Sequence, residues 1–223
     1  MGFEFPPPLA DEIRALDQDY SGEKLHSDAV DRALGFEIPE TERRVKARAS
    51  RQASQYEAQL WEHLSPDVFQ TPYSELYRIL RELAPPPGSK VVDLGAGYGR
   101  MAFLVEAFFP AVTFTGYELS AERVKEAQRV FALQRLERSE MIEADLGAPR
   151  FLPADAQVYF LYDFGTRVAI EKCLGDLRKI SRSHSIRVAA RGRASRDAIE
   201  RDHPWLSQVN VPKHFAHYSV YWS

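Results

Sequence analysis

Glycines and acidic residues in the middle of the chain have the types and spacing needed to bind a nucleotide-like ligand. Residues 91–100 read VVDLGAGYGR, so an apolar run reaches Asp93 and then a turn rich in glycine. Glycine has no side chain and adopts positive φ readily, so a ligand can lie against the bare backbone of such a turn. Glu118 lies 19 residues after Gly99, the usual distance for a carboxylate that accepts hydrogen bonds from ribose hydroxyls. This pattern predicts a site for a nucleoside-containing cofactor.

The spacing of the glycines separates two kinds of cofactor. A dinucleotide fold favours Gly-x-Gly-x-x-Gly, with a pyrophosphate at the start of the helix. Here the glycines are Gly95, Gly97 and Gly99, so the third comes one residue early, and Asp93 lies two residues before the first. An acid at this position would repel a pyrophosphate but attract an ammonium or sulfonium group. A tight strand-to-helix turn without any ligand is the alternative interpretation.

These motifs resemble those of a known enzyme family. The run DLGAGYG at 93–99 is similar to the first motif of the class I S-adenosylmethionine-dependent methyltransferases, and GYEL at 116–119 is similar to their second. The resemblance covers roughly 71–223. It implies S-adenosyl-L-methionine as cofactor, with S-adenosyl-L-homocysteine as product. The expected cofactor-binding residues are Asp93, Gly95, Ala96, Gly97, Tyr98, Gly99, Glu118, Leu119, Asp145, Leu146 and Tyr73.

Asp145 extends the expected site along the edge of the sheet, because ligands of open α/β sheets bind beyond the carboxyl ends of the strands. By the resemblance, Asp145 should accept a hydrogen bond from the adenine amino group, with Leu146 beside the ring. An aspartate that only forms a turn is the alternative. Glu143 is nearby and is a second candidate for the same contact.

Asp163 and Tyr162 are the expected catalytic residues. They lie in VYFLYDFG at 158–165, where the family places its substrate-facing residue. Asp163 could bind the amino group of the cofactor, orient an amine nucleophile, or only cap the next helix. Tyr98, Tyr162 and Phe164 could line a channel for an ammonium-bearing acceptor. Core packing accounts for Phe164 equally well.

The acceptor that the motifs favour is a protein amine. The order TPY at 71–73, then the two motifs, resembles the seven-strand protein-lysine methyltransferases. The fourth predicted strand runs into DFGT at 163–166, which differs from the Asn/Asp-Pro-Pro-Tyr/Phe sequence of enzymes that methylate adenine or glutamine amides. A small-molecule methyltransferase with residues 1–70 as a lid is the alternative. An NAD-dependent oxidoreductase or a non-catalytic nucleoside-binding protein would require the argument from Asp93 to be wrong.

The composition narrows the class of protein. The chain has 223 residues, 44% of them hydrophobic, and a formal net charge of −3. That charge argues against a nucleic-acid partner, and no apolar run approaches the ~20 residues of a membrane span. Cys173 is the single cysteine, so an internal disulfide is impossible and a cytoplasmic location is expected. No Cys/His pattern predicts a metal site, and the oligomeric state stays open.

The charges are unevenly placed. Residues 1–40 hold ten acidic and three basic side chains, whereas residues 178–201 hold eight basic and two acidic ones. Two solvated faces are one interpretation, and packing of one segment near the other, or guidance of a basic substrate, is the second. The residues 191–193, which read RGR, are expected near the mouth of the site. There they could bind a carboxylate or phosphate, or form a solvated loop.

The pattern of elements predicts a Rossmann-like α/β fold with a seven-stranded mixed sheet, an antiparallel C-terminal hairpin and a preceding N-terminal helical segment. Apolar runs predict strands at 90–94, 112–117, 139–144, 158–162 and 185–190, and a hairpin of 206–211 with 217–222. Helices are expected at 9–16, 25–34, 39–64, 73–83, 99–109, 120–134 and 167–180. Two units follow: a helical extension or lid at 1–70, and a cofactor-binding methyltransferase domain at 71–223.

Overall fold

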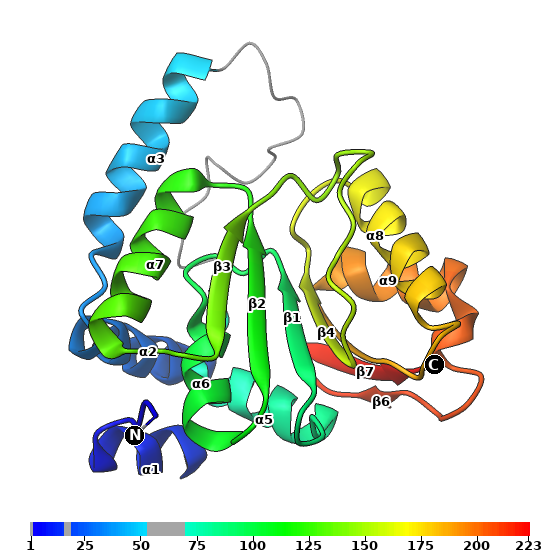
Figure 1. Ribbon diagram of the computed structural model, residues 1–223, viewed down its shortest axis with the longest axis horizontal. Helices are drawn as coiled ribbons and strands as arrows, with labels where there is room; N and C mark the ends of the chain where they lie inside the picture. The colour runs from blue at the N-terminus through cyan, green and yellow to red at the C-terminus, as the bar shows by residue number, and fades with distance from the viewer. Residues whose placement is uncertain (1, 16–18, 53–69) are drawn as a thin grey trace.

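A seven-stranded sheet lies at the centre of the computed structural model, which describes residues 2–15, 19–52 and 70–223. The strand order is β3-β2-β1-β4-β5-β7-β6 (Figure 1). The strands are β1 Lys90–Leu94, β2 Thr113–Glu118, β3 Ser139–Glu143, β4 Val158–Tyr162, β5 Arg187–Arg191, β6 Lys213–His214 and β7 Tyr218–Trp222. The first five run parallel, while β7 is antiparallel to β5 and to β6. The predicted mixed sheet is confirmed.

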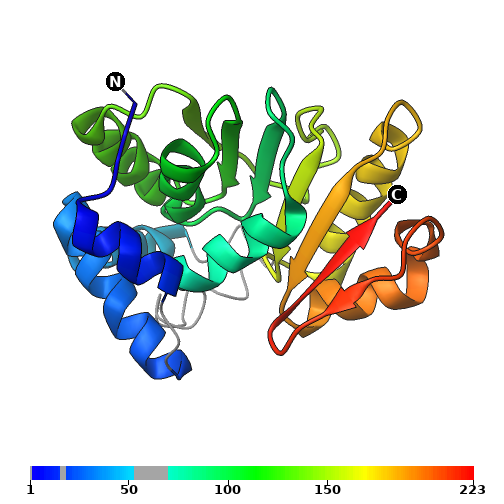
Figure 2. The ribbon, with the colours of Figure 1, turned by 90° about the horizontal axis from the view of Figure 1, so that it is seen from below.

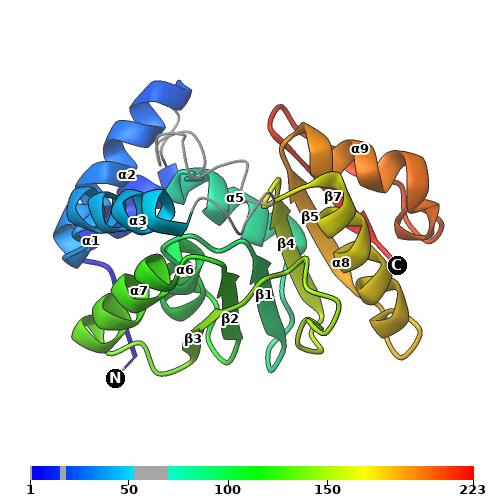
Figure 3. The ribbon, with the colours of Figure 1, turned by 90° about the horizontal axis from the view of Figure 1, so that it is seen from above.

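The central strands are apolar on both faces because helices cover both faces. In β1, Val91 faces one core cluster, whereas Val92 and Leu94 face the other. The first core contains residues of α5 (Tyr73–Leu83), α6 (Arg100–Phe108) and α7 (Ala121–Gln134). The second contains residues of α8 (Arg167–Ile180) and α9 (Arg193–Asp202). Figure 3 shows α8 and α9 together on one side of the molecule and α7 on the other.

Three helices precede α5 and the sheet along the described chain: α1 Pro7–Ala15, α2 Tyr20–Leu34 and α3 Ile38–Gln52. Both α1 and α2 pack on α5, and α3 packs on α7; Figure 2 shows α1 beside α5. Phe3, Phe5, Ile13, Val30 and Leu34 join the first core cluster. The N-terminal segment therefore shares its core with the sheet. The part of the predicted helix 39–64 that follows Gln52 lies outside the described residues.

The C-terminal hairpin differs from its prediction. The first strand was expected at 206–211, but the chain forms a 3₁₀ turn at Pro204–Leu206, and β6 occupies Lys213–His214. Val209 and Val211, which gave that run its strand-like alternation, are largely exposed. Helix α9 was not predicted, because it buries only a narrow stripe that includes Ala198 and Ile199.

Two helix starts are capped differently. The Ser120 hydroxyl accepts a hydrogen bond from the backbone N–H of Arg123 and so caps α7. At α5, Pro72 itself occupies the N-cap position, without a side-chain hydrogen bond. None of the described helices is both long enough and apolar enough to cross a membrane.

Candidate cofactor site

A cavity of about 320 Å³ opens at the carboxyl ends of β1, β2 and β4. Most of the residues that the sequence singled out lie around it. They are Asp93, Gly95, Ala96, Gly97, Tyr98, Glu118, Leu119, Asp145, Leu146, Tyr162 and Asp163. The topology explains the convergence, because parallel neighbouring strands bring their carboxyl ends to one edge of the sheet.

The three glycines of the turn have two different roles. One leaves space for a ligand, and the other two allow neighbouring side chains to pack closely against the backbone. Gly95, Gly97 and Gly99 all have positive φ. A Cβ on Gly97 would have no atom within 4 Å, so this position is open. A Cβ on Gly95 would lie 2.5 Å from Cβ of Phe164, and one on Gly99 would lie 2.7 Å from the ring of Phe131. Gly99 does not line the cavity. Its lack of a side chain lets the start of α6 pack closely against the neighbouring helix and the sheet.

Glu118 links the end of β2 to the glycine turn. One carboxylate oxygen accepts a hydrogen bond of 3.0 Å from the N–H of Gly97, and the other accepts one of 2.9 Å from the N–H of Ser120. A carboxylate has about four lone-pair sites, so these two bonds leave capacity for ribose hydroxyls. Glu118 therefore has both the position and the remaining acceptor sites that its predicted role requires.

Asp93 is a buried carboxyl group with an unsatisfied atom. It is 5% exposed, and its Oδ1 has no hydrogen-bond partner among the described residues. Burial, and then the charge of Glu118, raise the pKa of Asp93 to about 8. A cationic ligand beside these two acids would offset both effects. The residues present thus fit S-adenosyl-L-methionine, which carries an ammonium and a sulfonium group.

Asp145 both forms a turn and lines the cavity, so its geometry is compatible with both of its predicted roles. Its Oδ1 accepts a hydrogen bond of 2.9 Å from the N–H of Gly147, as a turn-forming aspartate does. Asp145 and Leu146 also line the cavity, and Leu146 is buried. Glu143 is exposed on β3 and is not among the lining residues. The described structure thus places Asp145, and not Glu143, where an adenine contact is possible.

Tyr73 lies away from the cavity, contrary to the expectation that it binds cofactor. It is fully buried in the first turn of α5, and its hydroxyl donates a hydrogen bond of 2.8 Å to Asp31. Its backbone N–H donates to the Ser27 hydroxyl of α2. The rotation of α5 points this ring into the core, and the preceding residues Gln70 and Thr71 line the cavity in its place.

Asp163 caps a helix, although not the one that follows it along the chain. Its carboxylate accepts hydrogen bonds from the N–H groups of Ala194 and Ser195, at 3.2 and 2.8 Å, and from the Ser195 hydroxyl at 2.9 Å. These contacts cap α9, whereas Thr166 caps α8. Gly192 is required beside it, because a Cβ there would overlap the Asp163 carboxylate. Three donors satisfy this carboxylate, so it is poorly suited to take a proton from a substrate.

Tyr162 separates the cofactor cavity from a second hollow. It ends β4, and the guanidinium of Arg191 lies 4.3 Å from the centre of its ring. The second hollow, of about 700 Å³, lies beside the first, and Tyr162 lines both. The two hollows therefore share this aromatic side chain as a common wall.

Two acids of the N-terminal segment, which no sequence motif marks, hold this site. Asp31 of α2 forms a buried ion pair with Arg100, the residue that begins α6 directly after the glycine turn. Glu42 of α3 contacts Tyr98, within the turn. The acidic excess of residues 1–40 was the available signal for Asp31, but it did not identify Arg100 as its partner, and Glu42 lies beyond that range.

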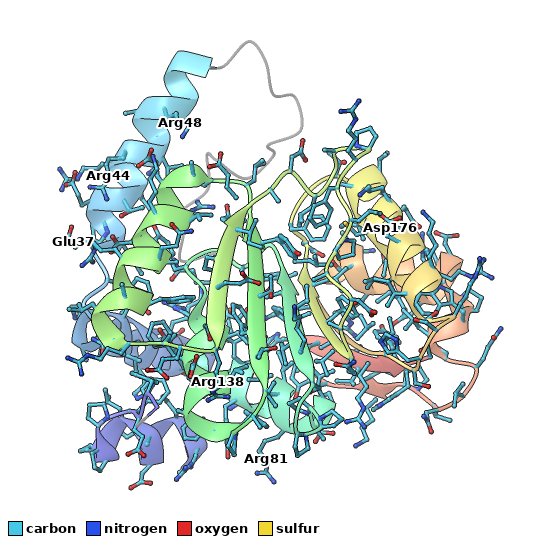
Figure 4. All side chains as sticks on the ribbon, viewed as in Figure 1. Glu37, Arg44, Arg48, Arg81, Arg138 and Asp176 are labelled. Atoms are coloured by element: carbon cyan, nitrogen blue, oxygen red, sulfur yellow. The ribbon has the colours of Figure 1, made fainter. Side chains whose placement is uncertain are left out.

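Several basic side chains of α3 have acidic partners. Arg44 and Arg48 lie 3.9 and 3.7 Å from Glu122 of α7, and Arg43 pairs with Glu40. Figure 4 labels Arg44 and Arg48 on α3, beside α7. These contacts place positive charges of α3 against acids of α3 and α7.

Two other kinds of chemistry lack the necessary groups. No cluster of three or more His, Cys, Asp or Glu side chains among residues 2–15, 19–52 and 70–223 could hold a metal ion. Cys173 is fully buried in α8, and burial raises the pKa of its thiol to about 12. Such a thiol is not a nucleophile near neutral pH.

Known proteins resemble this chain in sequence over the cofactor-binding motifs and in fold over a larger part. Residues 76–154 match the methyltransferase small domain. No curated protein sequence matches the chain significantly. The crystal structure of TrmN from Thermus thermophilus is similar with a TM-score of 0.50 and 15% identity, over 67% of this chain and 47% of that one, so the match spans about half of TrmN.

Two further solved structures are similar at lower TM-scores. An RNA methyltransferase from Salinibacter ruber in complex with S-adenosyl-L-homocysteine has a TM-score of 0.48 and 20% identity, over 69% of this chain and 91% of that one. A SAM-dependent methyltransferase from Aquifex aeolicus has a TM-score of 0.46 and 12% identity, over 66% and 88%. At these identities the likeness is one of fold.

Proposed function

We propose that this chain, a class I S-adenosylmethionine-dependent methyltransferase by its fold and its methyltransferase small domain, methylates an amine of a protein or peptide, with lysine as the acceptor. The observation that carries the choice of donor is the unpaired, buried Asp93 beside an open glycine turn. A buried carboxyl group without a partner is costly in free energy, and a cationic ligand removes that cost.

Each side of the cavity has a task in holding the cofactor. Asp93 supplies charge opposite to the cationic part, and Glu118 accepts hydrogen bonds from the ribose. The open backbone of Gly97 admits the ligand, and Asp145 with Leu146 contacts the adenine. When bound, the cofactor supplies an electrophilic methyl group. The protein then contributes mainly by positioning the acceptor in line with it.

The two hollows support an acceptor that reaches in from the surface. A cavity of about 320 Å³ is near the lower end of the range for small-ligand pockets, so a nucleoside cofactor fills most of it. We therefore assign the approach of the acceptor to the second hollow, past Tyr162, which lines both. A lysine side chain suits this path, because it presents an amine at the end of a flexible four-carbon stem.

The acceptor amine must be neutral to attack a methyl group. The Asp163 carboxylate already accepts three hydrogen bonds at α9, so we assign it the role of fixing the end of β4. The acceptor then gives its proton to water in the second hollow. Transfer should consequently be faster at higher pH, where more of the amine is neutral.

Methyl-labelled donor incubated with the full chain and a cell lysate tests the proposal. We expect label in protein, released on hydrolysis as methyl-lysine. Label found only in nucleic acid or in solvent-extractable material would refute the choice of acceptor. Calorimetric titration with S-adenosylhomocysteine and with NADH tests the choice of donor independently, since tight binding of NADH alone would reject it.

A further inference from the structure

The second hollow is built from side chains of mixed charge with a positive excess. It lies between the start of α2, the ends of β4 and β5, α9 and the loop before β7. Four of its lining side chains are Lys or Arg and two are acidic, which gives a local charge of +2 in a chain whose net charge is −3. A hollow of opposite sign to the whole molecule concentrates anionic groups at that place.

Most of these charges already have partners. Arg191 is buried and lies 3.0 Å from Glu75. Asp197 lies 3.6 Å from Arg193, and Glu200 accepts a hydrogen bond from the Tyr221 hydroxyl. Arg196 differs, because the described part of the chain places no carboxylate within ion-pair distance of it. An uncompensated guanidinium in this hollow is a ready partner for a carboxylate.

The hollow rests on fixed supports. The guanidinium of Arg191 donates to the Tyr20 hydroxyl at 2.7 Å and lies between the rings of Tyr20 and Tyr162, at 5.6 and 4.3 Å from their centres. Asp163 caps α9, which carries Arg196. Positions fixed by a cap and a buried ion pair are suited to specific recognition, because less conformational freedom is lost on binding.

From this arrangement we infer that Arg196 binds an acidic side chain of the acceptor polypeptide next to the target lysine; this inference rests on the proposed function. The lining favours a polypeptide over a nucleic acid. Asp197 and Glu200 interrupt the positive surface, so a row of phosphates would meet two acids here, whereas a polypeptide can present a single carboxylate to Arg196.

Synthetic peptides with one lysine flanked by glutamate, glutamine or arginine test the inference. They are titrated calorimetrically into the full chain saturated with S-adenosylhomocysteine. We expect the glutamate peptide to bind about tenfold more tightly than the glutamine peptide. Arg196→Gln should remove this preference, and Arg196→Glu should transfer it to the arginine peptide. The control is Arg182→Gln, which changes an exposed arginine outside the hollow.

Equal binding of the three peptides, or a preference that Arg196→Glu leaves unchanged, would overturn the inference. So would a single-stranded oligonucleotide that binds more tightly than the glutamate peptide and loses that affinity in Arg196→Glu. Mass spectrometry of the same peptides with S-adenosylmethionine separates the two proposals. Binding of the glutamate peptide without methyl transfer would refute the proposed activity, and transfer without charge preference would refute only the role of Arg196.

Discussion

The hydroxyl of Tyr98 donates a hydrogen bond of 2.8 Å to Glu42, and this contact ties the glycine turn to α3. Glu42 also accepts two hydrogen bonds from Arg123, at 2.9 and 3.2 Å. Arg123 in turn lies 3.6 Å from Glu118, which accepts from the N–H of Gly97. A closed ring of contacts therefore joins the N-terminal segment to both cofactor-binding motifs.

Glu42→Gln is expected to weaken the binding of S-adenosylhomocysteine. Without the Glu42 charge, Arg123 turns to Glu118 and competes with the ribose for its oxygens. We expect a loss of about 1.5–3 kcal/mol, the usual size for hydrogen bonds to charged groups, measured by calorimetry. Glu40→Gln, on the same helix but paired with Arg43 and Arg44 and not with the ring, is the matched control. Unchanged affinity in Glu42→Gln would show that the ring does not position the cofactor.

Asp31→Ala is expected to lower the stability of the whole chain. Asp31 and Arg100 are both nearly inaccessible, and removal of the acid leaves a buried guanidinium without its partner. The cost should be about 3–5 kcal/mol in the free energy of unfolding, measured by denaturant titration. Adding Arg100→Met should recover part of it, because the unpaired charge is then absent. A double variant no more stable than Asp31→Ala would contradict this account.

Local patterns explain why the glycine turn and Glu118 could be predicted. A buried strand, a glycine-rich turn and an acid at a fixed distance all lie within some thirty residues of sequence, and the apolar runs mark the strands around them. The ring around Glu42 has no such pattern, because its partners lie 56 and 81 residues away. The predicted cofactor contact of Tyr73 is wrong for a related reason. The sequence indicates where α5 begins, but it does not indicate how the helix is rotated about its own axis.

Asp163→Asn and Asp163→Ala should show whether Asp163 acts as a helix cap or as a catalytic base. Asparagine can still accept hydrogen bonds from α9, so Asp163→Asn should keep most of the stability and most of the methyl transfer. Asp163→Ala should lose about 0.5–2 kcal/mol of stability, measured by thermal unfolding. A base would give the opposite pattern, with transfer abolished in Asp163→Asn while the protein stays as stable as before.

Glu118→Ala should weaken the binding of the cofactor. The variant loses the acceptor for the ribose hydroxyls and also frees the N–H groups of Gly97 and Ser120. We expect affinity for S-adenosylhomocysteine to fall by about 1.5–3 kcal/mol or more. Glu143→Ala, at the end of the adjacent strand β3 but outside the cavity, should bind like the unmodified chain.

Asp93 should make both stability and donor binding depend on pH. Its pKa is about 8 in the folded chain and about 3.9 when unfolded. Between these values the folded state holds a proton that the unfolded state lacks, so stability falls as pH rises from about 4 to 8, by at most about 1.4 kcal/mol per pH unit. Affinity for S-adenosylmethionine should instead rise through pH 8, because the ionised carboxylate attracts the cationic ligand.

Asp93→Asn removes both pH effects and so provides the test. Asparagine stays neutral, so the variant should unfold at a higher temperature than the unmodified chain at pH 9 and lose this advantage towards pH 4. Its affinity for S-adenosylmethionine, measured calorimetrically from pH 6 to 9, should be lower and flat. If Asp93→Asn were less stable at every pH, or bound the donor with the same rising affinity, the buried carboxyl would not be the group that attracts the cofactor.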